Sequence, residues 1–587
     1  MQREVRKTVS VVFSDVAGST ALAEQLDPES LRRAMTRYFE VARRVHQRHG
    51  GVVEKFIGDA VMAVFGIPHV HEDDALRAVR AACELREEVA ALNRELEREL
   101  GVALHVRTGV NTGLVLAGDE QEGHAFVGGD TVNVAARLER AAGAGEVLVG
   151  EATHRLVADA VRVEPVAPFV PRGKTAPVAA FRLLEVAWGA AGLARRLDAP
   201  LVGRTGELDA LDRLLDRAAA GPACELVTIF GDAGVGKSRL LRAFAERARE
   251  RALVLSGGCP PYGEAVAAEV VGQLVAQAGR AGDGARTLGL ALDMTDPRSM
   301  FRGVRLLLET LARARPVVVL LDDVHRAEQV LLDLVEYLHA FAGARLLLVV
   351  AARRELPGRW PGWNVRAAGT VLDLEPLVEA EAAELAAGLL GPDRLPAGTA
   401  RQVAAWAEGN PLFVEQLLRD LADREDPGPL EPGGSWPVPP AVEALVAVEL
   451  DRLTADERTV VELASVVGRV FDWRSVAALA PAPLGPRVVG VLLALTRRNL
   501  LQVADREHGE DAFSFRHRLL RDAAYQAIPK RERAILHVRA ADHLQDEAVD
   551  HHLGQAYRYL AQLAGDEPRP APVARPLRPG PAAEVTA

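Results

Sequence analysis

The segment Glu225–Leu240, ELVTIFGDAGVGKSRL, restricts the fold of this chain more than any other. An apolar run ends at Gly231, the spacing Gly231-x-x-x-x-Gly236-Lys237-Ser238 follows, and a helical pattern begins at once. A glycine loop between a strand and a helix predicts an α/β domain, because the loop's N–H groups can surround phosphate oxygens. Lys237 would neutralise those oxygens, and Ser238 would reach a Mg²⁺ ion.

This pattern is a Walker A motif, and it contains one further glycine, Gly234, between Gly231 and Gly236. Downstream, Pro316–His325, PVVVLLDDVH, is a strand of the buried type that ends in two aspartates and resembles a Walker B motif. Asp322 would position the metal ion, and Asp323 would orient the attacking water. The two motifs predict a P-loop ATPase domain over residues 201–380 that binds ATP and Mg²⁺.

Two further segments belong to the same expected nucleotide site. The strand-like run Arg345–Glu355 contains Arg353 and Arg354, and either arginine could sense the γ-phosphate. Trp406–Leu418, WAEGNPLFVEQLL, resembles the nucleotide-contacting Gly-x-Pro region of signal-transducing (STAND/AAA-like) P-loop ATPases; the alternative is an ordinary turn between helices. The matching residues, within a helical subdomain expected over 381–430, are Gly409, Asn410 and Pro411.

The N-terminal third contains another strand-and-loop pattern. Thr8–Thr20, TVSVVFSDVAGST, is a β-branched and aromatic run that stops at Asp15 and continues in small residues. Val52–Phe65, VVEKFIGDAVMAVF, predicts a hairpin with Asp59 at its tip. A small-residue loop beside a carboxylate suggests a metal–phosphate site, and a divalent cation needs the second carboxylate. Each aspartate alone would be an ordinary cap or turn residue.

A third segment, Val127–Glu139, VGGDTVNVAARLE, has a glycine turn opening a helix on which Asn133 and Arg137 share one face. Together, FSDVAGST, EKFIGDA and GDTVNVAARLE resemble class III nucleotide cyclases, in the family's order. The resemblance implies a ferredoxin-like α+β catalytic domain over residues 1–186. It also implies two Mg²⁺ or Mn²⁺ ions at the paired aspartates.

The implied reaction converts ATP to 3′,5′-cyclic AMP and pyrophosphate, with the substrate's 3′-hydroxyl attacking the α-phosphate. Arg137 would stabilise the transferring phosphoryl group, and Asn133 would orient the ribose. Lys55 matches the family's purine-reading lysine and favours ATP, because an ammonium donates to adenine N1. Phe126 stands where many relatives accept a bond from the adenine amino group, so GTP or relaxed purine use is an alternative. Arg172, in VPRGKT, matches a triphosphate-contacting residue.

The family builds each active site between two cyclase domains, so the resemblance implies a homodimer. Asp15 and Asp59 would come from one protomer, and Lys55, Asn133 and Arg137 from its partner. This chain carries both half-sites in one cyclase segment, so a homodimer would contain two equivalent sites.

The remaining segments predict connections and a regulatory region. Residues 187–200 are rich in glycine, alanine and arginine and predict a linker. Residues 438–545 combine helical patterns with one hairpin-like alternation and resemble the winged helix and helical arm of the same ATPases. Because no Arg/Lys stripe stands out, an intramolecular role is favoured over DNA binding. Residues 546–587 predict a short helix and a disordered Pro/Ala-rich tail.

Composition restricts partners and compartment. The chain has 70 Lys and Arg against 81 Asp and Glu, and a net charge of −11 argues against a nucleic-acid surface. Three cysteines, Cys83, Cys224 and Cys259, are too sparse for a disulfide framework and predict a reducing cytosol. No membrane-spanning apolar run occurs in the sequence, so a cytoplasmic protein is expected. His69–Asp74, HVHEDD, predicts a helix cap at Asp73 rather than a metal cluster.

These patterns predict an adenylate cyclase regulated by a fused ATP-binding module and by an unknown protein regulator. One alternative is a nucleotide-switched scaffold whose cyclase domain is inactive. Another is a DNA-binding transcription factor. The sequence leaves open whether the ATPase hydrolyses or only binds nucleotide, and whether it activates or inhibits the cyclase.

Overall fold

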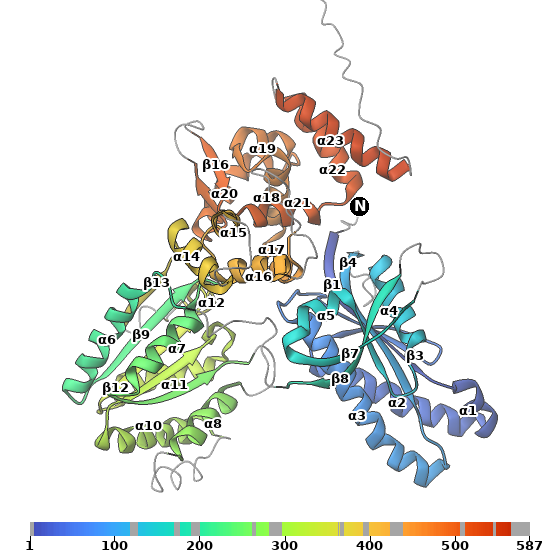
Figure 1. Ribbon diagram of the computed structural model, residues 1–587, viewed down its shortest axis with the longest axis horizontal. Helices are drawn as coiled ribbons and strands as arrows, with labels where there is room; N and C mark the ends of the chain where they lie inside the picture. Colours follow the sequence, from blue (N-terminus) through green and yellow to red (C-terminus); the bar gives the residue numbers. More distant parts are fainter. Residues whose placement is uncertain are drawn as a thin grey trace, which may run out of the picture. The chain divides into compact units, whose positions relative to one another are not determined.

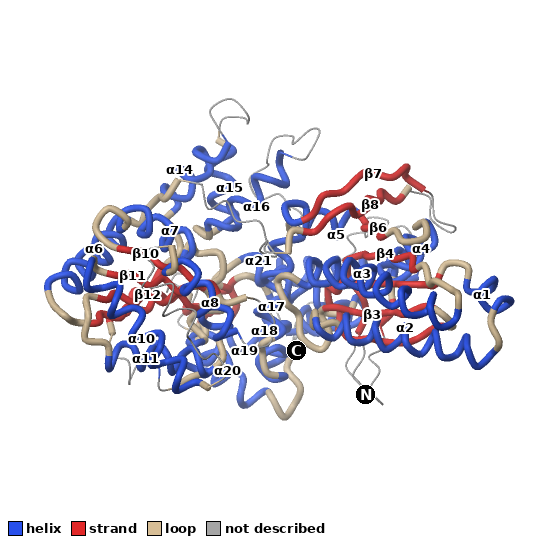
Figure 2. The backbone as a smooth tube through the Cα atoms, turned by 90° about the horizontal axis from the view of Figure 1, so that it is seen from below, coloured by secondary structure: helices blue, strands red, loops and turns tan. Residues whose placement is uncertain are grey.

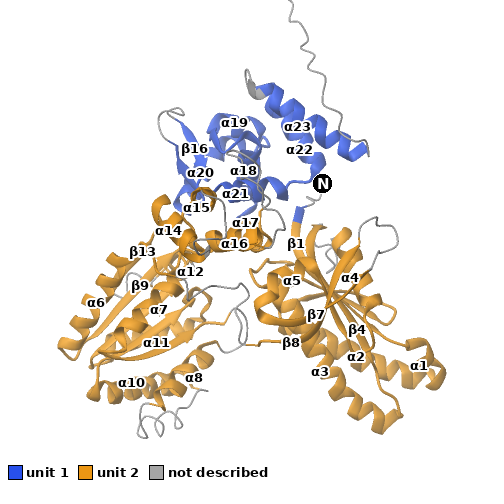
Figure 3. Cartoon of the chain, viewed as in Figure 1, with its two compact units in different colours: residues 1–6, 452–587 blue, residues 7–451 orange. Residues whose placement is uncertain are grey.

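The computed structural model describes residues 5–117, 127–169, 177–188, 200–260, 266–280, 296–361, 363, 369–390, 398–422, 438–504, 511–543 and 547–564. Phe126, Arg172, most of the expected linker and the expected tail lie outside these residues. The chain divides into two compact units, one of Lys7–Asp451 and one of Met1–Arg6 with Arg452–Ala587 (Figure 3). Each unit is described by itself.

The N-terminal part of the larger unit is built on one sheet, eight-stranded within the described residues (Figure 1). Its spatial order is β2-β3-β1-β4-β6-β8-β7, with β5 paired to β4. The expected hairpin is present as the antiparallel pair β2–β3. The strands are β1 (Val5–Val16), β2 (Val52–Ile57), β3 (Ala60–Phe65), β4 (Val106–Ala117), β5 (Val127–Gly128), β6 (Val147–Gly150), β7 (Val161–Phe169) and β8 (Val178–Val186).

Helices cover both faces of this sheet, because successive residues of β1 point to opposite sides. Val12 and Val16 pack in the cluster that contains α2 and α3. Val11 and Phe13 pack instead in a cluster that includes Ala135 of α4. The helical elements are α1 (Ser19–Gln25), α2 (Pro28–Arg48), α3 (Asp74–Leu100), α4 (Asp130–Ala141), α5 (Glu151–Val157) and the 3₁₀ turn η1 (Ala158–Ala160).

The start of α3 differs from the expected cap in one respect. Asp73 occupies the N-cap position, as expected, but its side chain makes no capping bond. Its carboxylate instead accepts a hydrogen bond of 2.9 Å from Nε of Arg77, and both side chains are buried. A buried guanidinium without a carboxylate would be an uncompensated charge, so the Asp73 side chain pairs with Arg77 instead of capping the helix.

Helix α4 lies directly on β4 at Gly109. A Cβ atom at this glycine would lie 2.3 Å from the carbonyl oxygen of Ala135 and 2.3 Å from the backbone nitrogen of Glu139. Both atoms belong to the α4 backbone, so neither can move without displacing the helix. Gly109 therefore sets how closely the helix that carries Asn133 and Arg137 approaches the sheet.

The second part of the larger unit is a parallel sheet of five strands in the described residues, with the order β10-β11-β12-β9-β13. Strand β12 lies between β9, which leads into the glycine loop, and β11, which ends at Asp322. Because the strands are parallel, their carboxyl ends meet at one edge. The strands are β9 (Cys224–Gly231), β10 (Leu253–Gly258), β11 (Val317–Asp322), β12 (Leu346–Ala352) and β13 (Thr370–Leu374).

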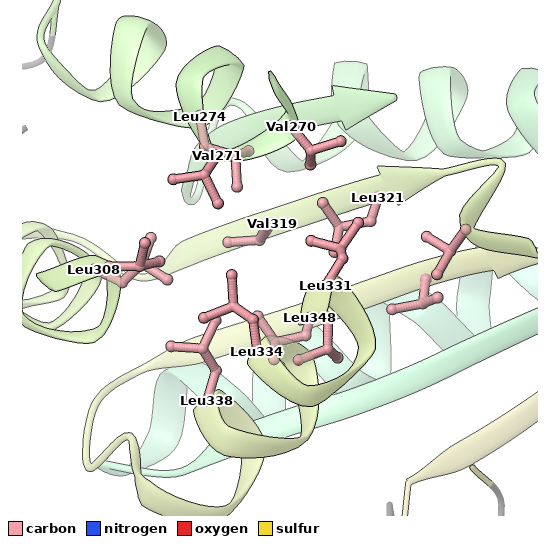
Figure 4. Packing of buried hydrophobic residues seen from close by; sticks show 14 of the residues in the cluster. Val270, Val271, Leu274, Leu308, Val319, Leu321, Leu331, Leu334, Leu338 and Leu348 are labelled. Carbon is pink, nitrogen blue, oxygen red and sulfur yellow. The ribbon is translucent and has the colours of Figure 1, made fainter. Parts of the chain in front are cut away.

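Two layers of helices enclose this sheet (Figure 2). Val319 and Leu348 pack against α8, α10 and α11 (Figure 4). Val318 and Val349, which point the other way, pack against α6 and α7. The helices are α6 (Thr205–Ala220), α7 (Lys237–Ala248), α8 (Val266–Ala278), α10 (Pro297–Ala314), η2 (Val324–Arg326), α11 (Gln329–Phe341), α12 (Leu356–Arg359), α14 (Glu379–Leu390), α15 (Thr399–Ala407), α16 (Pro411–Ala422) and α17 (Pro440–Asp451).

The smaller unit contains helices and a short antiparallel sheet of order β14-β16-β15. The antiparallel β15–β16 pair forms in the segment where apolar and polar residues alternate. The assignment of residues 438–545 as a winged helix and helical arm stays a prediction. None of the helices in the described part of the chain combines the length and apolarity needed to cross a membrane. The elements are α18 (Ala455–Val467), β14 (Val470–Asp472), α19 (Trp473–Leu479), η3 (Gly485–Arg487), α20 (Val488–Arg497), β15 (Leu501–Val503), β16 (Ala512–Phe515), α21 (Arg518–Ala527), α22 (Lys530–His543) and α23 (Glu547–Ala564).

Replacing Gly109 by alanine should destabilise the β4–α4 contact. An added methyl group overlaps the α4 backbone, and such overpacking costs about 1–3 kcal/mol. Hydrogen exchange of the β4 and α4 amides should therefore be about 5- to 150-fold faster in Gly109→Ala, as measured by mass spectrometry. The control is Gly206→Ala, where a Cβ meets nothing within 4 Å. Equal exchange in Gly109→Ala and the parent chain would contradict this account of the packing.

Candidate active site and phosphate-binding loop

Asp15 and Asp59 lie side by side where β1 ends next to the β2–β3 turn. Antiparallel pairing sets Ser14 of β1 opposite Val61 of β3, so the turn that holds Asp59 reaches the end of β1. The two carboxylates are within hydrogen-bonding range of each other. Burial and then the negative charge of Asp59 raise the pKa of Asp15, against the opposing effect of a bond from Arg107. A pair of carboxylates that repel each other in a half-buried site suits a divalent cation.

Two residues that the sequence reasoning did not select join this cluster. Nη2 of Arg107, in β4, donates a 2.6 Å hydrogen bond to Asp15, and Nε of Arg107 lies 2.6 Å from Oε1 of Glu139. Burial raises the pKa of Glu139 to about 7, because desolvation outweighs the attraction of Arg107. The sequence signal for Arg107 is weak, because a charged residue inside a strand-like run does not indicate its partner; the contact with Asp15 depends on β4 lying beside β1.

The other expected cyclase residues lie on β2 and α4. Lys55 is exposed on β2, four positions before Asp59. Asn133 is exposed and Arg137 is half-buried, one turn apart on α4. The carboxylates thus lie at the end of β1 and in the neighbouring β2–β3 turn, whereas the lysine, asparagine and arginine lie elsewhere, on β2 and α4.

The glycine loop connects β9 to α7, which begins at Lys237. Gly234 has a φ of 79° and Gly236 a φ of 107°, in the left-handed region that favours glycine. Nζ of Lys237 donates to the carbonyl oxygens of Gly231 (2.8 Å) and Asp232 (2.9 Å). One pocket is lined by four of the five expected P-loop residues, Gly234, Gly236, Lys237 and Ser238. Gly231 is not among the residues that line it, and its carbonyl oxygen accepts a bond from Lys237 instead.

The Walker B segment and the strand that follows it, β12, each place one of their two candidate residues in the lining of this pocket. Asp323 and Arg353 line it. Oδ1 of Asp322 accepts a 2.8 Å bond from the Asp323 N–H, and Asp323 itself has a φ of 54°. Arg354 pairs instead with Asp373 (3.0 Å) and with Glu375 (2.8 Å). Of the two arginines that the sequence left open, Arg353 is the one that lines the pocket, whereas Nε of Arg354 lies 3.6 Å from Oδ1 of Asp232 in the glycine loop.

Asn410 fixes the helical subdomain to the phosphate loop. Nδ2 of Asn410 donates a 2.9 Å bond to the carbonyl oxygen of Ala233. Oδ1 of Asn410 accepts from the N–H groups of Leu412 (3.1 Å) and Phe413 (3.4 Å), at the start of α16. The Leu412 N–H also donates to the carbonyl oxygen of Gly234 (3.3 Å). This segment therefore contacts the loop directly, which an ordinary interhelical turn would not explain.

Three family models match segments of the chain. Residues 1–181 match the adenylate and guanylate cyclase catalytic domain. Residues 200–350 match an AAA ATPase domain, and residues 378–426 match a domain of unknown function. The chain therefore joins a class III adenylate/guanylate cyclase domain to an AAA ATPase domain in one polypeptide, as the sequence motifs predict.

Among curated relatives, an uncharacterised protein of Rhizobium meliloti is 27% identical over an alignment of 594 positions, which covers 91% of this chain and 56% of that protein. Adenylate cyclase 1 of the same organism is 31% identical over 138 residues, which are 23% of this chain and 21% of that protein. The chain thus spans about half or less of these relatives' length.

Among solved structures, the adenylyl cyclase CyaB from P. aeruginosa is 30% identical, with 33% of this chain and 98% of that chain covered and a TM-score of 0.30. The guanylyl cyclase Cya2 is also 30% identical, with 32% and 98% covered and a TM-score of 0.30. The similar proteins thus include cyclases named for either nucleotide.

Replacing Asn410 by alanine should weaken nucleotide binding at the phosphate loop. The change leaves the Ala233 carbonyl and two N–H groups without this partner, and such losses cost about 1–3 kcal/mol. We expect about 5- to 150-fold weaker Lys237-dependent binding of a fluorescent ATP analogue. The matched control is Asn93→Ala, which removes a similar double bond to Leu104 in the cyclase domain. Equal affinities of the two variants would contradict the assignment.

Proposed function

We propose that the N-terminal domain is an adenylate cyclase that converts ATP to 3′,5′-cyclic AMP and pyrophosphate. The observation that carries this proposal is the adjacency of Asp15 and Asp59 at the ends of paired strands. The family match over residues 1–181 supports a nucleotide cyclase, and the similarity to Adenylate cyclase 1 of Rhizobium meliloti supports ATP as substrate.

The chain's own residues supply the binding and charge for this reaction. Asp15 and Asp59 would hold two Mg²⁺ or Mn²⁺ ions, which lower the pKa of the 3′-hydroxyl and neutralise phosphate charge. The 3′-oxygen bonds to the α-phosphorus, its proton passes to solvent, and the bond to the β-phosphate oxygen breaks. Arg107 orients Asp15 through its 2.6 Å hydrogen bond. No protein nucleophile is required.

Preference for ATP rests on Lys55, which is exposed on β2. An ammonium donates to the unprotonated N1 of adenine, whereas N1 of guanine carries a proton. Phe126 opposes this preference, because its ring cannot accept a hydrogen bond from the adenine amino group. The assay that tests the function must therefore compare ATP with GTP.

A homodimer would complete two equivalent sites. Asn133 and Arg137 lie on α4, where Arg137 would stabilise the transferring phosphoryl group of the partner's substrate and Asn133 would orient its ribose. Arg172 would contact the triphosphate.

The P-loop domain would bind ATP with Mg²⁺ and regulate the cyclase in the cytoplasm. Lys237 and Ser238 support the first part, because they line one pocket with Asp323 and Arg353. Asp322 would position the metal ion, and Asp323 would orient water if hydrolysis occurs. The C-terminal region would act as a winged helix within the protein, since α20 exposes Val489 and Leu493 rather than a basic face.

The purified full-length chain should form cyclic AMP from ATP with Mg²⁺ or Mn²⁺, and Asp59→Asn should lower the rate by at least about 100-fold because one metal ligand loses its charge. The control is Asp27→Asn, since asparagine caps a helix as well as aspartate does. Formation of cyclic GMP from GTP would change the assigned substrate from ATP to GTP or to either purine nucleotide. No cyclic product with either metal would favour the nucleotide-switched scaffold.

Mixing two inactive variants should restore activity if the site is shared between protomers. In an equal mixture of Asp59→Asn and Arg137→Ala that exchanges subunits freely, half of the dimers are mixed, and each mixed dimer has one intact site. About a quarter of the parent activity is therefore expected, measured as cyclic AMP formed after subunit exchange. Activity that stays at the level of the separate variants would refute the shared site.

A further inference from the structure

The loop that connects β3 to α3 in the cyclase domain contacts two arginines of the ATPase domain, and one of them lines the pocket at the phosphate loop. Glu72, in this loop, pairs through Oε1 with Arg326, and its Oε2 accepts a 2.8 Å bond from Nη2 of Arg353. The side chains of Arg353 and Glu72 are only 7% and 10% exposed. Water therefore screens this ion pair little, and removing one partner leaves a buried charge.

Both arginines belong to the carboxyl-end edge of the parallel sheet. Arg353 follows β12 and lines the pocket together with Lys237. Arg326 lies in η2, just beyond Walker B, and its Nη1 is 3.6 Å from Oδ2 of Asp323. A cyclase carboxylate thus contacts two arginines that follow the adjacent strands β11 and β12, and one of them, Arg353, lines the pocket at the phosphate loop.

A second carboxylate approaches Arg353 from within the ATPase part. Oε1 of Glu449, in α17, lies 3.4 Å from Nη1 of Arg353. The two carboxylates offset the desolvation that would lower the pKa of this buried guanidinium and raise its pKa overall. Arg353 therefore stays charged, with its donors distributed among Glu72, Glu449 and the pocket.

We propose that Glu72 of the cyclase domain and the terminal phosphate of bound ATP compete for Arg353. A guanidinium presents its donors in one plane, and an N–H that donates to Glu72 cannot donate equally well to a phosphate. ATP at the phosphate loop therefore weakens the Glu72 contact. By thermodynamic linkage, the contact weakens ATP binding by the same factor. This inference rests on the proposed ATP binding by the P-loop.

The position of Glu72 gives the competition a path to the cyclase carboxylates. Its loop follows β3, and β3 begins immediately after Asp59. On its other side, Asp73 anchors the start of α3 through the buried bond to Arg77. Release of Glu72 therefore frees the β3–α3 loop near α3. The other end of this loop continues into β3, which leads directly to the turn that holds Asp59.

The test measures binding of a fluorescent ATP analogue with Mg²⁺ to the full-length chain, and subtracts the binding that remains in Lys237→Ala. Glu72→Gln should bind at least about fivefold more tightly, the lower end of typical coupling between sites. The control is Asp159→Asn, which weakens another contact of the cyclase domain, with Arg419 (2.6 and 2.7 Å) on α16 of the helical subdomain, a residue that does not line the pocket. Its affinity should equal that of the parent chain.

Unchanged or weaker binding by Glu72→Gln, or equal tightening by Asp159→Asn, would overturn the proposal. Hydrogen exchange of the parent chain gives a second readout that requires no Glu72 variant: the analogue should speed exchange in residues 66–74, and an unchanged rate there would also overturn it. Neither measurement requires cyclic product, so an inactive cyclase would not affect the outcome. Absence of any Lys237-dependent binding would refute this proposal together with ATP binding, and would leave the cyclase assay independent.

Discussion

Antiparallel pairing between β1 and β3 determines whether the cyclase domain has a site at all. The pairing brings Asp59, in a turn between two strands, to the end of the strand that carries Asp15. A slip of one residue would turn the side chains of β1 to the opposite faces of the sheet, away from their packing partners. Val12 is buried on one face of the sheet and Val11 and Phe13 on the other, which prevents this slip. The packing of the core therefore also determines where the two carboxylates lie.

The ATPase domain brings its functional groups together through a parallel sheet. Three strands that are distant in sequence end at one edge, and each delivers a different kind of group: a loop of N–H donors from β9, a carboxylate from β11 and a guanidinium from β12. Placing β12 between the other two puts the positive charge of Arg353 where it faces both. The same placement exposes that arginine to Glu72, a residue of the other domain.

Sequence reasoning identified the groups whose position follows from local structure. Lys237 and Ser238 lie in a loop whose spacing determines its shape, and the hairpin around Asp59 spans few residues. It did not identify Arg107, because that role depends on β4 lying beside β1. Glu72 meets Arg353 across 281 positions, which no local pattern indicates. Phe126 and Arg172 lie outside the described residues, so their roles stay predictions.

The close contact between the phosphate loop and α16 has a mechanical consequence. A methyl group at Gly234 would lie 2.6 Å from Oδ1 of Asn410 and 2.7 Å from Cβ of Leu412, so the two segments are in contact without intervening side chains. Two further hydrogen bonds join them. The loop and the first turn of α16 therefore behave as one stiff piece, and any movement of the helical subdomain would be transmitted directly to the phosphate loop.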